Sequence, residues 1–108
     1  MKPVLFTSEV EEDLLKLVGI LVEKGYFSAE EYAIIYVEEI VTYIQKNLSI
    51  STSKPIPTFF IRNGVNLQYI IYRKSPRTTW YIFFEETDEA YYVRHITNNH
   101  IAGQYFNV

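Results

Sequence analysis

Cysteine is absent from this 108-residue chain. Its absence excludes disulfide bonds and thiolate metal sites, and it is compatible with the reducing interior of a cell. Long apolar runs are missing near the start as well, because residues 1–15 (MKPVLFTSEVEEDLL) contain one run of three apolar residues, Val4–Phe6, before the charged residues begin. This pattern predicts neither a signal peptide nor a membrane span, so we expect a cytoplasmic protein that does not contact membranes.

An excess of basic residues is also lacking, because the formal net charge is −3. The charge is unevenly divided along the chain. Residues 1–48 contain nine acidic residues and four lysines, a net charge of −5, whereas residues 49–108 contain six basic and four acidic residues, a net charge of +2. A protein dedicated to binding polyanions usually has a clearly basic domain. We therefore expect at most a local basic patch, in the second half of the chain.

Several signatures of known chemistry are missing. The sequence shows no glycine-rich phosphate loop, no Ser-His-Asp set and no pair of carboxylates at catalytic spacing. Its two histidines, His95 and His100, are five positions apart, which would place them on opposite faces of a continuous strand, and no third metal ligand lies nearby. We therefore expect neither a metal nor a cofactor.

Apolar and aromatic residues are abundant. Hydrophobic residues make up 48% of the chain and charged residues 21%, which is typical of a folded globular domain, and the length suits one domain over residues 1–108. Ten tyrosines and seven phenylalanines are unusually many. Tyrosines fill cores, but they also line contact surfaces, because they offer a large area with little flexibility.

The first half predicts a strand followed by a helix. Residues 3–7 (PVLFT) are β-prone, and Ser8 then begins a capping box with Glu11. Apolar residues recur at helical spacing at Val10, Leu14, Leu17, Val18 and Leu21. Gly25 is expected to end this helix, because glycine tolerates the left-handed conformation common at helix ends.

A second helix is predicted almost immediately. Ser28 begins another capping box, with Glu31. The apolar face of this helix consists of Ala33, Tyr36, Val37, Ile40, Ile44 and Leu48. Because few residues separate the two helices, we expect them to pack as an antiparallel hairpin.

The second half predicts a sheet. Residues 49–58 form a polar connector containing prolines, and residues 59–64 (FFIRNG) are compatible with either a strand or a helical turn. Residues 67–74, 78–86 and 90–97 are rich in β-branched and aromatic residues, and the short segments between them imply antiparallel hairpins. We therefore predict an α+β fold in which the helical hairpin covers one face of an antiparallel sheet of three to four strands.

This order of elements resembles the RelE/ParE superfamily of bacterial toxins. Three motifs accompany the resemblance: Gly-x-Asn-Leu-x-Tyr at Gly64–Tyr69, Thr-x-Trp-Tyr-x-Phe-Phe at Thr78–Phe84, and Asn-Asn-His at Asn98–His100. The resemblance covers nearly the whole chain. It implies the toxin of a type II toxin–antitoxin system, of the kind linked to plasmid stabilization, with an antitoxin protein as partner. A homodimer is a further option.

The resemblance leaves two mechanisms open. RelE-like members are endoribonucleases that cut mRNA in the ribosomal decoding site without a metal, whereas ParE-like members inhibit DNA gyrase by binding. For RNA cleavage, a base activates the ribose 2′-hydroxyl, an acid protonates the leaving 5′-oxygen, and cations stabilise the phosphorane. The resemblance then implies His100 as the acid, Tyr105 on the substrate, and Arg73 and Arg94 on phosphate. Arg77, Tyr72 and Asn99 are further candidates for substrate or partner binding.

Each candidate also has a structural interpretation. His100 would bind a loop carbonyl, Asn99 would close a turn, and the basic residues would be solvated strand ends. Active RelE-like members place an arginine on the third strand, where this sequence has Trp80 and Tyr81, and this difference favours binding without hydrolysis. The histidine and tyrosine near the C-terminus favour the nuclease. On strand alternation, Arg73 and the neighbouring Lys74 face opposite sides of the sheet.

Overall fold

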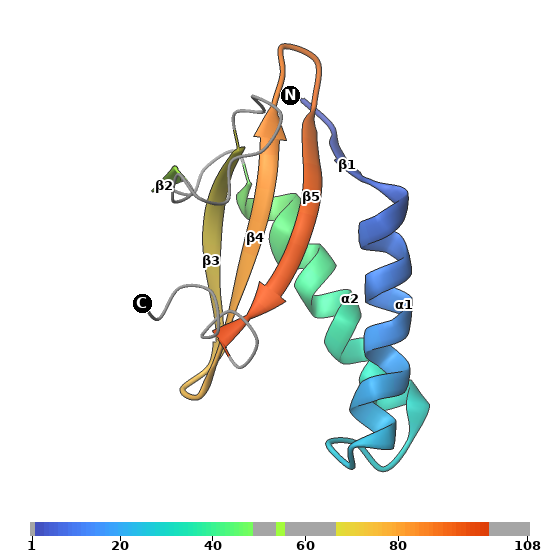
Figure 1. Ribbon diagram of the computed structural model, residues 1–108. Helices are drawn as coiled ribbons and strands as arrows, with labels where there is room; N and C mark the ends of the chain where they lie inside the picture. The colour runs from blue at the N-terminus through green and yellow to red at the C-terminus, as the bar shows by residue number, and fades with distance from the viewer. Residues whose placement is uncertain (1, 49–53, 56–66, 100–108) are drawn as a thin grey trace.

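The computed structural model describes residues 2–48, 54–55 and 67–99 (Figure 1). In chain order, its elements are β1 (Val4–Phe6), α1 (Ser8–Glu23), α2 (Glu30–Asn47), β2 (Lys54–Pro55), β3 (Leu67–Ser75), β4 (Thr78–Glu86) and β5 (Tyr91–Asn98). The described part of the chain is therefore α+β, as predicted. The segment 59–64 and both candidate catalytic residues, His100 and Tyr105, lie outside the described residues.

The sheet has five strands in the order β1-β5-β4-β3-β2. Strands β3, β4 and β5 pair antiparallel, with Ile82 opposite both Ile70 and Ile96, as the short connections predicted. The predicted antiparallel sheet of three to four strands is confirmed for β3, β4 and β5, but the whole sheet is mixed, because β1 pairs parallel to β5 and β2 adds a two-residue edge. A hairpin turn imposes antiparallel pairing only on consecutive strands, whereas β1 and β5 are separated by the whole domain.

Helix α1 begins one residue earlier than its capping box predicted. Thr7 has an extended backbone, and its hydroxyl accepts a hydrogen bond from the Val10 amide at 3.4 Å, so Thr7 is the N-cap and Ser8 is the first helical residue. The predicted end is confirmed: Gly25 follows the C-cap residue Lys24 and has a φ of 79°.

Helix α2 begins without a side-chain cap. Its N-cap residue is Ala29, which has an extended backbone and accepts no hydrogen bond through its side chain. The capping box predicted at Ser28 and Glu31 is therefore wrong, because Ser28 lies one position before the residue that adopts the N-cap conformation. The helix is stabilised instead by its buried apolar face, as is usual for helices in proteins.

The core lies between the helix pair and one face of the sheet (Figure 1). Its buried residues are Val10, Ile40, Ile44, Leu48, Ile70, Trp80, Ile82, Phe84 and Val93. A smaller cluster of Leu21, Ala33 and Val37 lies between the helices. The apolar faces predicted for both helices are therefore confirmed. Trp80 is 4% exposed, and its indole Nε1 donates to the Tyr36 hydroxyl at 3.1 Å, which ties β4 to α2.

Candidate functional site

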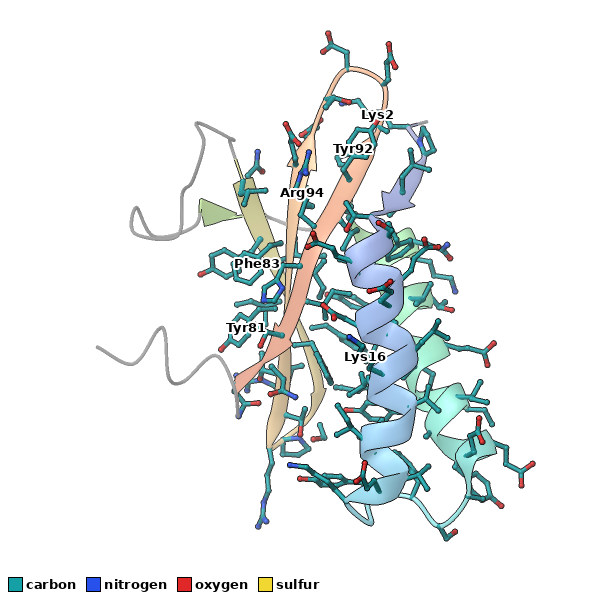
Figure 2. All side chains as sticks on the ribbon, turned by 45° about the vertical axis from the view of Figure 1, so that its right-hand side comes forward. Lys2, Lys16, Tyr81, Phe83, Tyr92 and Arg94 are labelled. Atoms are coloured by element: carbon teal, nitrogen blue, oxygen red, sulfur yellow. The ribbon has the colours of Figure 1, made fainter. Side chains whose placement is uncertain are left out.

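Neither helix of the described residues covers the opposite side of the sheet, and we call that side the helix-free face. Alternation and the pairing register assign it Tyr69, Ile71, Arg73, Tyr81, Phe83, Glu85, Tyr92, His95 and Thr97. Figure 2 shows Tyr81 and Phe83 pointing away from the helices. Strand β4 thus presents Trp80, Ile82 and Phe84 to the core and Tyr81 and Phe83 to the helix-free face.

An aromatic row crosses the helix-free face. The ring centroids of Tyr69 and Tyr81 are 6.2 Å apart, those of Tyr69 and Phe83 are 5.6 Å apart, and those of Phe83 and His95 are 5.7 Å apart. Phe83 is only 6% exposed, whereas His95 is exposed. The row therefore has a buried centre and an accessible end at His95.

A β-bulge changes which way β5 presents its side chains. Phe83 lies opposite His95, but Phe84 lies opposite Val93, so Arg94 is the extra residue. Strict alternation would place Arg94 on the core side. Instead its guanidinium reaches Glu85 on the helix-free face, with Nε donating to Oε1 at 2.9 Å. The bulge therefore places Arg94 and His95 on the same face.

The basic side chains that the structure describes do not form one phosphate-binding patch. Arg94 is paired with Glu85, and Lys74 lies on the helix side of the sheet, where its Nζ is 2.8 Å from a Glu39 carboxylate oxygen. Arg73, the neighbour of Lys74 in β3, therefore faces the other side of the sheet, as predicted. Arg73 is exposed on the helix-free face, and Arg77 is exposed in the turn between β3 and β4. Neither of these two makes an ion pair within residues 2–48, 54–55 and 67–99.

Two other candidates have structural roles here. The Tyr72 ring stacks on that of Tyr43 in α2 with centroids 3.9 Å apart, so Tyr72 packs against the helices and not on the helix-free face. Asn99 connects the end of β5 to the neighbouring hairpin. Its Oδ1 accepts from the Thr79 amide at 3.0 Å, and its Nδ2 donates to the Arg77 carbonyl at 3.1 Å. These contacts correspond to the turn-closing role considered for an asparagine here.

Sequence reasoning missed two members of this face. His95 was considered only as a metal ligand, and Glu85 was not considered at all. Alternation from Phe83 would have placed Glu85 correctly, but the pairing of Glu85 with Arg94 depends on the bulge. Among the described residues, no group of three or more His, Asp or Glu side chains is arranged to hold a metal ion.

Comparison with known proteins leaves the family undetermined. No protein-family model matches the chain, and no curated protein or solved structure matches it. Neither α1 nor α2 is long and apolar enough to cross a membrane, and these are the helices of the described residues.

Proposed function

We propose that this protein is a RelE/ParE-like toxin of a type II toxin–antitoxin system and that it acts in the cytoplasm through the helix-free face. The observation that supports this proposal is that both helices of the described residues cover the same face of the sheet. The two helices pack on one face, and the aromatic row with Arg73 and His95 occupies the other (Figures 1 and 2). The α+β order of elements is compatible with the resemblance seen in the sequence motifs.

Within this proposal, the described side chains favour a non-catalytic, ParE-like inhibitor. Stabilising the extra negative charge of a phosphorane requires cations aimed at the reacting phosphate. Here Glu85 already pairs with Arg94, and Lys74 lies on the other side of the sheet. Aromatic side chains, in contrast, are enriched where proteins contact one another. We therefore propose protein targets for this face: DNA gyrase as the inhibited enzyme and an antitoxin as the masking partner.

The ribosome-dependent mRNA endoribonuclease is the alternative, and Asn99 is the residue that favours it. Asn99 is held against the β3–β4 hairpin beside Arg77, and the candidate acid His100 is the next residue in the chain. Arg77, Arg73 and His95 are all exposed. In this mechanism the chain would use its own acid, base and cations, with no metal.

Inducible expression in a bacterial host, with mapping of mRNA 5′ ends, tests both mechanisms. Growth arrest without new RNA ends is the result expected for the inhibitor. Arrest with new ends that disappear in His100→Ala and Tyr105→Phe would instead establish the nuclease. No arrest, with the folded chain present at high level, would refute the toxin proposal.

The role of the helix-free face has its own control. The double variant Arg73→Ala/His95→Ala changes two exposed side chains of this face and is expected to abolish arrest. Lys16→Ala changes an exposed side chain of α1, and it is expected to leave arrest intact (Figure 2). Equal arrest by the wild type and the double variant would show that this face is not the working surface.

A further inference from the structure

The helix pair has an apolar groove of its own. It has a volume of about 570 Å³ and is lined by residues of α1 and α2, among them Leu15 and Val18 of α1 and Ile34 and Val41 of α2. No residue of the described strands lines it. The groove therefore lies on the side of the helix pair away from the sheet, and it is distinct from the helix-free face.

Two apolar residues at this groove, Leu15 and Ile34, are exposed, whereas Val37 at its base is buried between the helices. Leu15 is 75% exposed and Ile34 is 40% exposed, although both belong to regular helices. Helices that pack on one side only usually carry polar residues on the other. A third helix packed along the groove would cover both side chains, because the side-chain ridges of one helix pack into the grooves of its neighbours.

The charge beside the groove specifies the chemistry of that third helix. Glu11 lines it from α1 and Glu38 from α2, and neither carboxylate forms an ion pair with the described residues. No lysine or arginine of the described residues lines the groove. The surrounding sequence, residues 1–48, has a net charge of −5. A partner that brings lysines or arginines beside its apolar stripe would therefore meet an unpaired carboxylate on each side.

We propose that this groove binds an amphipathic helix of another protein, with an apolar stripe flanked by lysine or arginine. A second copy of this chain is the poorer occupant, because two such grooves would bring Glu11 and Glu38 of one copy against those of the other. The proposal does not depend on toxin activity. It would hold equally for a nuclease, an inhibitor or a simple binding module.

A pair of synthetic peptides tests the proposal on the full chain. One is a helix of about four turns with leucines at i, i+3, i+4 and i+7 spacing and lysines beside them. The other has glutamates in place of those lysines. Fluorescence anisotropy is expected to show that the lysine peptide binds at least about tenfold more tightly than the glutamate peptide. Amide shifts of the ¹⁵N-labelled protein should localise the binding to α1 and α2.

Matched variants distinguish binding in the groove from a general attraction of the lysine peptide to an acidic protein. Leu15→Glu should weaken binding of the lysine peptide by about tenfold, because the large apolar contact that it removes outweighs the attraction between the new exposed carboxylate and the lysines. Ile20→Glu makes the same change at an exposed position of α1 outside the groove, and it should bind as the wild type does. Glu11→Lys should weaken binding more than Glu12→Lys, although both change the net charge equally.

Three results would overturn the proposal. The first is that the lysine peptide does not bind or binds no better than the glutamate peptide. The second is that Leu15→Glu and Ile20→Glu weaken it equally, which would indicate binding elsewhere. The third is a dimer in sedimentation experiments that Leu15→Glu dissociates, which would make a second copy the occupant. Circular dichroism of each variant confirms that the fold is retained.

Discussion

Removing the hydroxyl of Tyr36 should destabilise the protein through a single hydrogen bond. In Tyr36→Phe the ring remains, so its packing with Phe27 at 5.5 Å and with Trp80 at 6.4 Å between centroids is retained. Only the acceptor of the Trp80 Nε1–H, now 3.1 Å away, is lost. Because the Trp80 residue is 4% exposed, water has little access to replace that acceptor.

The expected cost follows from leaving a buried donor unpaired. Such a group costs about 1–3 kcal/mol, and we expect about 1–2 kcal/mol here because the phenylalanine ring still fills the space. For a domain of this size, this loss corresponds to a fall in Tm of about 5 °C or more. The matched control is Tyr26→Phe, the same change at a residue that is 69% exposed, which should alter the free energy of unfolding by less than about 0.5 kcal/mol.

Urea unfolding provides the measurement. Trp80 is the only tryptophan of the chain, so its fluorescence reports on this contact, while far-UV circular dichroism reports on the helices. Coincident transitions would justify a two-state analysis. If Tyr36→Phe and Tyr26→Phe had the same stability within about 0.3 kcal/mol, the hydrogen bond would contribute nothing measurable, and this account of how β4 is held to α2 would be refuted.

Three further changes probe other parts of the fold. Ile82→Ala, at a fully buried position in the central strand, should cost about 2–5 kcal/mol in urea unfolding, and a loss below 1 kcal/mol would contradict the described core. Thr7→Ala should lower the free energy of unfolding by about 1 kcal/mol because the N-cap is lost, whereas Ser8→Ala should have little effect. A larger loss in Ser8→Ala than in Thr7→Ala would show that Ser8 is the N-cap, as the capping box predicted. Asn99→Ala should accelerate hydrogen exchange at the Thr79 amide several-fold at unchanged helix content. Unchanged exchange would show that Asn99 does not hold the end of β5 to the hairpin.

Much of the fold was predictable because it is locally encoded. Apolar residues at helical spacing predicted both helices and their buried faces, and short connections predicted the β3–β4 and β4–β5 hairpins. The left-handed Gly25 was predictable for the same reason. The caps were harder to predict. Thr7 and Ser8 are both favoured N-cap residues, and the second helix uses Ala29, which cannot cap through its side chain, although Ser28 precedes it; the backbone conformation decides in both places.

The candidate site was less predictable than the fold. Alternation alone placed Arg73 and Lys74 on opposite faces of the sheet, and the structure shows that Lys74 is the one on the helix side. Alternation fails across the middle of β5, because a bulge opposite Phe83 and Phe84 makes Arg94 an extra residue between Val93 and His95. Tyr72 was a candidate for binding because tyrosines favour contact surfaces, and its stacking on Tyr43 depends on where α2 lies against the sheet.

The sequence by itself therefore determined the kind of each element, the direction of the hairpin strands and the apolar surfaces that must be buried. The tertiary structure alone decided that β1 joins β5 in parallel, that Glu85 pairs with Arg94, and that Tyr36 accepts from Trp80. The physical reason is the range of the interactions. Helical spacing and hairpin turns act over a few residues and leave a pattern in the sequence, whereas these contacts form between distant segments or across a bulge, and such contacts leave no local pattern.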